Sequence, residues 1–306
     1  MYNNTGDTKK NYKVAIVTGS SSGIGFETSL LLARNGFYTY ATMRNPDKSK
    51  KEGMINVANR DRLPLQVIPL DVTDDKSVKE AVDRIATEQG KIDVLVNNAG
   101  YLLLGPLEEL SIEEFKEQFE TNFFGVIRVT QAVLPIMRRQ RQGTIVNIIS
   151  IAGRIGFPLS SPYVSSKFAL EGLSESIGYE LEQFGINVVL IEPGVIKTNF
   201  ANNLKIGKKI ATTANTRSTD NPYYSPYSEI TQKRIVGFKP RFESGSPPIE
   251  VAKIILKVLT SKNPDFRYLV GDDAFKLMEM RKNTSDKDFR KLVMESVLQY
   301  QQQQWQ

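Results

Sequence analysis

The sequence predicts a doubly wound, parallel α/β sheet of the Rossmann type, because short apolar runs alternate with longer amphipathic stretches. The runs are rich in β-branched residues and apolar throughout, as is typical of strands covered on both faces. We expect strands at 13–18, 38–42, 65–70, 92–96, 143–149 and 186–192. Ligands of such folds bind beyond the carboxyl ends of the strands, so we expect the functional residues there.

Helices are expected between these strands. Ser111 and Glu114 form a capping-box pattern at the start of the third helix. Gly185 follows the fourth helix, where a left-handed residue commonly ends a helix. The expected ranges are 24–35, 75–89, 111–139 and 161–184.

Residues 197–245 interrupt the alternation, since they are rich in Asn, Thr, Ser, Tyr and Pro. A long irregular stretch inside a compact domain is typical of a substrate loop or of partial disorder. A helix is expected again at 246–260, with Ser246 as its cap and Pro247 in its first turn. A short strand at 267–271 and helices to about residue 299 complete the chain.

The chain is expected to form one domain over 13–299, between polar tails at 1–12 and 300–306. The first dozen residues lack the apolar core of a signal peptide, and no apolar run approaches the ~20 residues of a membrane helix. We therefore expect a cytoplasmic protein without a membrane span.

Composition excludes several kinds of chemistry. The 306 residues include no Cys and no His, which excludes disulfides, thiolate catalysis and imidazole bases. Proton transfer must rely on Tyr, Lys, Asp or Glu, and no metal site is expected. The net charge of +6 fits an anionic ligand or a merely basic surface. Because the basic residues are scattered, we expect no nucleic-acid partner.

A glycine-rich turn joins the first strand to the first helix, with the spacing G-x-x-x-G-x-G. Glycines let the backbone approach a pyrophosphate, and a helix N-terminus favours an anion. The alternative is a tight turn that needs glycine for backbone reasons alone. The candidate cofactor-binding residues here are Gly19, Ser20, Ser22, Gly23, Ile24 and Gly25.

The end of the second strand bears on the form of the cofactor. It carries Arg44 and no acidic residue. An acid there would bind the ribose hydroxyl of NAD, whereas a cation pairs with the 2′-phosphate of NADP. NADP(H) is therefore favoured and NAD(H) remains possible, the alternative for Arg44 being a solvated loop charge.

Two further strand ends carry candidate residues. Asp71, ahead of Thr73, either accepts a hydrogen bond from an adenine amino group or serves as a turn residue. Asn98, Ala99 and Gly100 follow the fourth strand. Their small size suits a chain that passes beside a ligand, and an Asn amide can brace neighbouring backbone. A simple strand-end turn is the alternative.

Tyr163 and Lys167 lie four residues apart in an expected helix and therefore share a face. A phenol has a pKa near ~10, and a nearby ammonium favours the phenolate and lowers that pKa. Tyr163 is thus a candidate general acid and base. Ser150, after the fifth strand, is placed to hydrogen-bond a substrate oxygen. An exposed helix face is the alternative for the Tyr/Lys pair.

These motifs together resemble the short-chain dehydrogenase/reductase family in its shorter, single-domain form. The resemblance covers 13–200 and is carried by TGSSSGIG, NNAG, Ser150, YVSSK (163–167) and Pro193-Gly194. The segment with Arg44 further resembles NADP-linked members that act on steroids, retinoids and other lipophilic alcohols. The resemblance implies hydride transfer between NADP(H) and a secondary alcohol, ketone or aldehyde.

The resemblance also implies roles for individual residues. Tyr163 would be the acid and base, Lys167 would lower its pKa and hold the nicotinamide ribose, and Ser150 would orient the carbonyl. Asn122 would hold a water in a proton relay, its alternative being a polar bracket for a helix irregularity. Asp71 and Val72 would contact the adenine, and Asn98, Ala99 and Gly100 would line the adenosine side. The nicotinamide carboxamide would meet Pro193, Gly194, Ile196 and Thr198.

Within 197–245, Tyr223, Tyr224, Tyr227 and Phe238 either form aromatic walls of the substrate site or pack the loop down. A non-catalytic NADP(H)-binding sensor on the same fold is the main functional alternative. The resemblance further implies a homodimer or homotetramer that pairs through helices 111–139 and 161–184.

Overall fold

The computed structural model describes residues 12–46, 51–213 and 225–298. Its centre is a parallel sheet of seven strands in the order β3-β2-β1-β4-β6-β7-β9. The expected polar tails lie outside the described residues, apart from Tyr12. The strands are β1 (Lys13–Val17), β2 (Phe37–Met43), β3 (Leu65–Pro69), β4 (Val94–Asn97), β6 (Gly143–Ile148), β7 (Ile186–Pro193) and β9 (Arg267–Val270).

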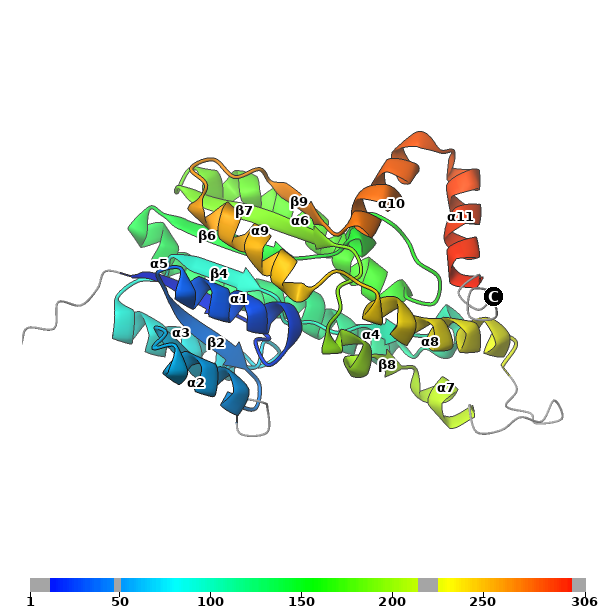
Figure 1. Ribbon diagram of the computed structural model, residues 1–306, viewed down its shortest axis with the longest axis horizontal. Coiled ribbons are helices and arrows are strands. Elements are labelled where there is room, and N and C mark those ends of the chain that lie inside the picture. The colour runs from blue at the N-terminus through cyan, green and yellow to red at the C-terminus, as the bar shows by residue number, and fades with distance from the viewer. Residues whose placement is uncertain (1–11, 47–50, 214–224, 299–306) are drawn as a thin grey trace, which may run out of the picture.

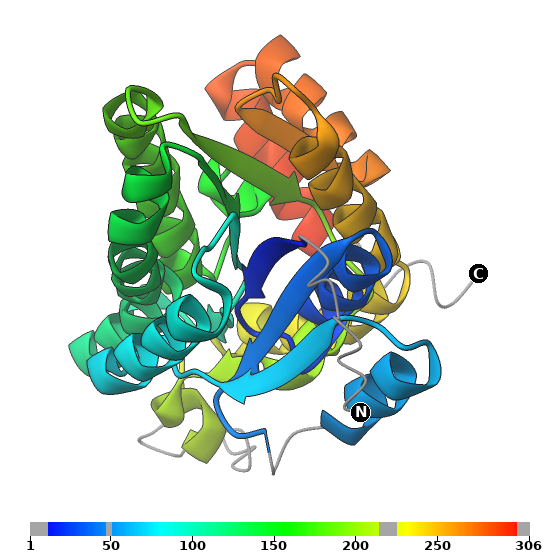
Figure 2. The same ribbon diagram turned by 90° about the vertical axis from the view of Figure 1, so that its left-hand side faces the viewer.

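Helices cover both faces of this sheet, as Figure 2 shows in a view across the layers. One face carries α3 (Asp75–Gln89), α5 (Gly125–Gln140) and α6 (Ser161–Glu182). The other carries α1 (Gly23–Arg34), α2 (Lys51–Arg60) and α9 (Pro248–Thr260). The doubly wound parallel fold expected from the alternation of strands and helices is confirmed.

Successive side chains of β1 pack in two different hydrophobic clusters, one on each face of the sheet. Val14 and Ile16 pack in the cluster under α3, α5 and α6, whereas Ala15 and Val17 pack in the cluster under α1 and α9. All four side chains are fully buried. Because successive strand residues point to opposite faces, a strand covered twice must be apolar at every position. This explains the unbroken apolar runs in the sequence.

The expected helix 111–139 is interrupted within its length. Ser111 caps α4 (Ile112–Phe119) with the complete capping box to Glu114. A π-helical turn at Glu120–Phe124 then leads directly into α5. Such turns widen a helix by one residue and frequently occur at functional sites. The turn carries Asn122.

Two helix ends test the capping expectations. Gly185 has φ +68°, as expected for a left-handed residue after α6. The start of α9 differs by one residue from the expectation, because Pro247 is the N-cap and Pro248 occupies the first turn. Ser246 instead pairs with the backbone of 195–197: its N–H donates to the Val195 carbonyl oxygen, and its own carbonyl accepts from the Lys197 N–H.

The segment 197–245 is more regular than expected where it is described. It contains a 3₁₀ turn at Asn199–Asn203, β8 (Lys205–Ile206), α7 (Lys208–Thr213) and α8 (Ser228–Glu243). β8 pairs in parallel with the short β5 (Leu103–Leu104). The helix α2 was not expected either.

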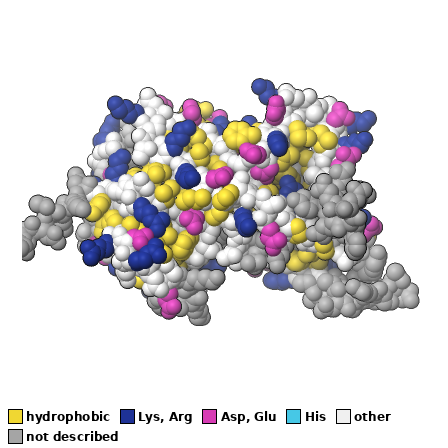
Figure 3. Space-filling model, viewed as in Figure 1, with side chains coloured by type: hydrophobic (Ala, Val, Ile, Leu, Met, Phe, Trp, Pro, Cys, Tyr) yellow, Lys and Arg dark blue, Asp and Glu magenta, His cyan; other side chains and the backbone are white. Residues whose placement is uncertain are grey.

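The end of the molecule beyond the strands' carboxyl termini gathers the remaining elements. Figure 1 places α4, α7, α8, α10 (Asp272–Asn283) and α11 (Asp286–Leu298) in its right-hand half. On the face in Figure 3, basic and acidic side chains are interspersed. Among the described residues, no helix is long and apolar enough to cross a membrane.

Candidate active site

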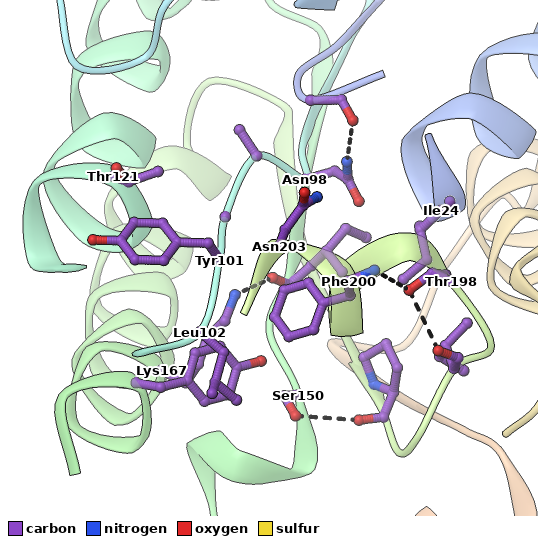
Figure 4. A pocket seen from close by; sticks show the side chains of 18 of the residues that line it. Ile24, Asn98, Tyr101, Leu102, Thr121, Ser150, Lys167, Thr198, Phe200 and Asn203 are labelled. Carbon is purple, nitrogen blue, oxygen red and sulfur yellow. Dashed lines mark hydrogen bonds between the residues drawn. The ribbon is translucent and has the colours of Figure 1, made fainter. Parts of the chain in front are cut away.

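A cavity of about 830 Å³ opens beyond the carboxyl ends of the strands. Figure 4 shows Lys167 at the lower left, Ser150 at the bottom, Asn98 at the top and Ile24 at the right, with Phe200 near the centre. The structure brings most of the predicted site residues together here. The predicted residues that line the cavity are Gly19, Ser22, Gly23, Ile24, Arg44, Asp71, Val72, Asn98, Ala99, Gly100, Ser150, Tyr163, Lys167, Pro193, Gly194, Ile196 and Thr198.

Three predicted residues, Ser20, Gly25 and Asn122, do not line the cavity. Ser20 is fully buried, and its hydroxyl donates to the Val17 carbonyl oxygen at 2.8 Å. The Ser20 side chain therefore stabilises the turn from the protein interior. Ser21, which the sequence analysis did not single out, lines the cavity instead.

The glycine-rich turn needs its glycines for conformation and for space. Gly19 and Gly23 have φ of +67° and +59°, a region that disfavours side chains. A Cβ on Gly19 would lie 2.8 Å from the Ala99 Cα, and one on Gly25 would lie 2.5 Å from the Asn98 Nδ2. The turn therefore packs against the residues that follow β4. α1 begins at Gly23, within this glycine-rich segment, and has no acidic residue in its first turn, which suits an anion at its N-terminus.

Asn98 braces this turn. Its Nδ2 donates to the carbonyl oxygens of Thr18 at 2.9 Å and Gly19 at 3.1 Å. In return, the Thr18 Oγ1 accepts from the N–H groups of Asn98 and Ala99. The two strand ends are thus fixed to each other, so the backbone that faces the cavity is preorganised.

Tyr163 lies half-buried in the cavity wall, beside Ser150. Burial raises the pKa of the Tyr163 phenol to about 12, and its hydrogen bond with Ser150 acts in the opposite direction. The phenol is therefore protonated at neutral pH, which is the form that a general acid requires. Ser150 is itself oriented, because its Oγ accepts from the Ala152 N–H at 3.1 Å and donates to the Pro193 carbonyl oxygen at 3.3 Å.

Lys167 lies one helical turn from Tyr163, with its Nζ 5.8 Å from the centroid of the Tyr163 ring. The Nζ donates to the Ile148 carbonyl oxygen at 2.8 Å. Burial lowers the pKa of Lys167 to about 8, because a buried ammonium loses hydration. The expected lowering of the Tyr163 pKa by Lys167 is not found in this structure, where burial dominates both groups.

Asn122 connects the π-helical turn to the strand-end segment. Its Oδ1 accepts from the Tyr101 N–H at 3.1 Å, and its Nδ2 donates to the Tyr101 carbonyl oxygen at 3.0 Å. The same Nδ2 lies 3.4 Å from the Ser166 Oγ. The structure thus shows Asn122 as the polar bracket of a helix irregularity, and it fixes Tyr101, which lines the cavity.

Arg44 and Asp71 lie at the edge of the cavity near β2 and β3. Arg44 is exposed and follows the end of β2. The Asp71 Oδ1 accepts from the N–H and the hydroxyl of Thr73, at 2.9 and 2.8 Å. The turn role of Asp71 is therefore present in the structure, with the residue still lining the cavity.

The segment after β7 closes the cavity opposite the glycine turn. A Cβ on Gly23 would lie 3.0 Å from the Thr198 side chain, so the two segments meet. The Thr198 Oγ1 accepts from the Phe200 N–H at 3.2 Å. Asp273, which sequence reasoning missed, accepts from the Val195 N–H at 2.8 Å and holds this segment from α10.

A row of aromatic rings leads away from Tyr163 toward α8. The ring centroids of Tyr163 and Phe200 lie 6.1 Å apart, those of Phe200 and Phe242 5.9 Å, and those of Phe242 and Phe238 4.5 Å. Phe238 is buried in this aromatic wall, which agrees with the first of the two roles expected for it. Tyr227 instead packs the segment down, donating from its hydroxyl to Glu108. Tyr223 and Tyr224 lie outside the described residues.

Sequence reasoning missed several residues that line the cavity, among them Phe200, Arg234, Arg241 and Phe242. Three of these lie on α8, at spacings of seven and eight residues from Arg234. Such spacings place residues on one helix face. The signal was present, but Gly237 and Pro240 obscured the helix in the sequence.

A family model described as short chain dehydrogenase matches residues 13–209. The chain belongs to the short-chain dehydrogenase family. It is accordingly a dehydrogenase/reductase that acts on CH–OH groups and transfers hydride.

Characterised and uncharacterised proteins resemble this short-chain dehydrogenase over most of its length. An uncharacterised oxidoreductase, YusZ, of Bacillus subtilis is 40% identical over 85% of this chain and 90% of its own. A 3-ketodihydrosphingosine reductase of Bacteroides thetaiotaomicron is 38% identical over 85% of this chain and 88% of its own. Bovine retinol dehydrogenase 8 is 40% identical over 83% and 80%.

Solved structures of short-chain dehydrogenases share the fold. An alcohol dehydrogenase from the archaeon Thermococcus sibiricus, complexed with 5-hydroxy-NADP, has a TM-score of 0.67 and 25% identity over 85% of this chain and 96% of its own. A Burkholderia phymatum member in complex with NAD has a TM-score of 0.75 and 22% identity over 89% and 94%. The second likeness concerns the fold alone.

Proposed function

We propose that this chain is an NADP(H)-linked reductase or dehydrogenase of a lipophilic ketone or secondary alcohol, with Tyr163 as its acid and base. The convergence of Tyr163, Ser150 and Lys167 on one cavity that also contains the glycine-rich turn carries the proposal. A sensor without catalysis would have no need of a protonated phenol beside an oriented serine.

The residues present fit a nicotinamide dinucleotide. Gly19 and Gly23 line the cavity, so a pyrophosphate there could approach their backbone, and the N-terminus of α1 has no side-chain cap to compete for its first N–H groups. Lys167 lines the same cavity, where its ammonium is available to ribose hydroxyls. When bound, the cofactor supplies or accepts the hydride.

Proton transfer falls to this chain's own side chains. In reduction, the Tyr163 hydroxyl donates its proton to the carbonyl oxygen while the Ser150 hydroxyl holds that oxygen. In oxidation, the phenolate form accepts the proton from the alcohol. Lys167, charged below a pH of about 8, stabilises that phenolate. The side chain of Asn122 holds the Tyr101 backbone, and the family resemblance assigns this residue a water of the proton relay.

Arg44 supports the preference for NADP(H). It is an exposed cation that lines the cavity after β2, where no acid is present to bind a ribose hydroxyl. A guanidinium binds a phosphate through two parallel hydrogen bonds. The likeness to a structure that holds an NADP derivative agrees with this preference.

We further propose a cytoplasmic homodimer or homotetramer. Phe124, Phe168 and Tyr179 are exposed by 46%, 45% and 73% on the π-helical turn and α6. Exposed aromatic side chains on neighbouring helices suit an interface between copies. Light scattering of the purified protein measures the assembly.

A spectrophotometric screen tests the reaction. Purified protein is mixed with ketones and aldehydes of increasing apolar size, with NADPH and NADH in parallel, and oxidation of the nicotinamide is followed. We expect turnover with NADPH and better kcat/KM for apolar ketones. Binding of NADPH without turnover of any carbonyl compound would favour the sensor.

A further inference from the structure

Two arginines enter the cavity from α8, at a distance from the reacting groups. Arg234 and Arg241 lie seven residues apart and both line the cavity. Phe238 and Phe242 lie on the same helix and line it as well. The helix thus presents two cations and two aromatic rings to the interior.

Arg234 is half-buried, and its Nε is a buried atom without a hydrogen-bond partner. Its guanidinium carbon lies 5.8 Å from the centroid of the Phe238 ring. Burial, with a smaller contribution from Arg241, lowers the pKa of Arg234 to about 10. The side chain still carries its charge at neutral pH, so it is a partly buried cation whose Nε–H donor is buried and unpaired.

No described carboxylate pairs with Arg234 or Arg241. The carboxylates of the cavity wall have other partners: Glu117 lies 3.5 Å from the Lys205 Nζ, and Glu120 lies 2.7 Å from an Arg128 Nη2. A buried charge is costly unless an opposite charge accompanies it. The described part of the protein does not supply that charge, so a ligand is the natural source.

The path between the arginines and Tyr163 is apolar. It runs along Phe238, Phe242 and Phe200, whose rings contact one another in sequence and end at Tyr163. Leu102, Leu104 and Leu204 pack against the same rings. An alkyl chain that lies along these rings would connect a reacting carbon at Tyr163 with a group at Arg234.

We propose that the substrate is a carbonyl or alcohol compound with an apolar chain that ends in a carboxylate, bound by Arg234 and Arg241. The inference rests on the proposed function, because it takes Tyr163 as the site of reaction. A planar guanidinium with several donors matches a carboxylate in two hydrogen bonds. The carboxylate is unchanged by the reaction and serves only to bind and align the substrate.

The test compares matched substrates. Methyl ketones that bear a terminal carboxylate on alkyl chains of increasing length are compared with their methyl esters and with ketones that end in an amine. Each is assayed with NADPH on the whole protein and on Arg234→Gln, Arg241→Gln and Arg290→Gln. Arg290 is an exposed arginine on α11 and serves as the control.

We expect the keto acid of the best length to exceed its ester in kcat/KM, and the amine to be poorest. A charge-assisted hydrogen bond is worth about tenfold to a hundredfold in affinity. Arg234→Gln should therefore lower kcat/KM for the keto acid by about that factor and leave the ester unchanged. Arg290→Gln should change neither.

A binding measurement separates this inference from the proposed function. Calorimetry with an alkanoate and the alkanol of equal length needs no turnover. The alkanoate should bind more tightly to the whole protein, and Arg234→Gln should remove the difference. Tight alkanoate binding without ketone reduction would contradict the proposed function alone. Equal kcat/KM for keto acid and ester, with equal binding of alkanoate and alkanol, would overturn the arginine site alone.

Discussion

Glu171 and Glu192 place two buried carboxylates beside a single guanidinium, that of Arg267. The Arg267 Nε lies 3.1 Å from the Glu171 Oε2 and 3.5 Å from the Glu192 Oε1. Arg154 and Glu175 complete the group, with Arg154 3.4 Å from Glu192 and Glu175 2.8 Å from Arg267. Burial, followed by the neighbouring Glu192, raises the pKa of Glu171 to about 7. Glu171 therefore holds a proton below neutral pH.

This arrangement predicts a pH-dependent stability. A carboxyl whose pKa is raised on folding contributes its full stability below its unfolded pKa, near ~4.5, and loses it as pH rises through about 7. The glutamine in Glu171→Gln cannot ionise. The free energy of unfolding of this variant, compared with that of the parent, should therefore increase by on the order of 2 kcal/mol as the pH rises from about 5 to about 8. Urea unfolding across this range measures the difference.

Glu175→Gln is the matched control for that experiment. Glu175 is exposed, and its hydrogen bond with Arg267 lowers its pKa. Its contribution is present above its unfolded pKa, so its loss should not stabilise the protein at high pH. If both variants changed stability in parallel at every pH, the raised pKa of Glu171 would be contradicted.

Tyr163→Phe removes the proposed proton carrier and little else. Ketone reduction should fall by about a hundredfold or more, since a positioned acid contributes that much. The dissociation constant for NADPH, measured from nicotinamide fluorescence, should stay within about twofold. Near-normal turnover in this variant would remove Tyr163 from the role of acid.

Arg44→Ala tests the choice of cofactor. Loss of a guanidinium–phosphate pair should raise KM for NADPH by about tenfold to a hundredfold, because a hydrogen bond to a charged group is worth ~1.5–3 kcal/mol. KM for NADH, which has no 2′-phosphate, should change little. Arg62→Ala, at a position that does not line the cavity, is the control. Equal changes for both cofactors would refute the pairing.

Lys167 predicts the alkaline limit of reduction. The pKa of Lys167 is lowered to about 8 by burial, whereas the pKa of Tyr163 is raised to about 12. The kcat/KM for reduction should therefore fall through about pH 8 as the lysine loses its charge, while the phenol is still protonated.

Lys167→Arg keeps the charge at every accessible pH, so the alkaline fall should move upward even if turnover is slower. The dissociation constant for NADPH, followed over the same pH range, provides a second measurement. A fall that stays at the same pH in this variant would assign it to another group.

The sequence predicted the sheet strands best, because most of their residues are buried. Each of the seven sheet strands follows from a mainly apolar run, because most strand positions face one of the two hydrophobic layers. The two-residue strands β5 and β8 were not expected, since two residues carry no pattern. α2 was missed because KEGMINVANR is mostly polar and has few apolar positions.

The candidate site was predictable to the extent that it depends on residue type and spacing. The cavity collects the Tyr163, Lys167 and Ser150 side chains as the spacing indicated. The pKa of Tyr163 is raised, with burial as the largest cause, and burial cannot be read from the spacing of Tyr163 and Lys167 in the sequence. Nothing in the sequence indicated the buried side chain of Ser20 or the bracket that Asp273 makes.

The two ends of the segment between 205 and 246 are fastened separately to the rigid body. Lys205 donates from its N–H to the Leu102 carbonyl oxygen at 2.9 Å, and Ser246 donates to the Val195 carbonyl oxygen at 3.0 Å. A stretch whose two ends are both anchored can be replaced by another of similar length, because the replacement changes the loop-closure entropy little. Exchanging this stretch between relatives should therefore transfer substrate preference. The proton-transfer residues lie outside the stretch and would not change.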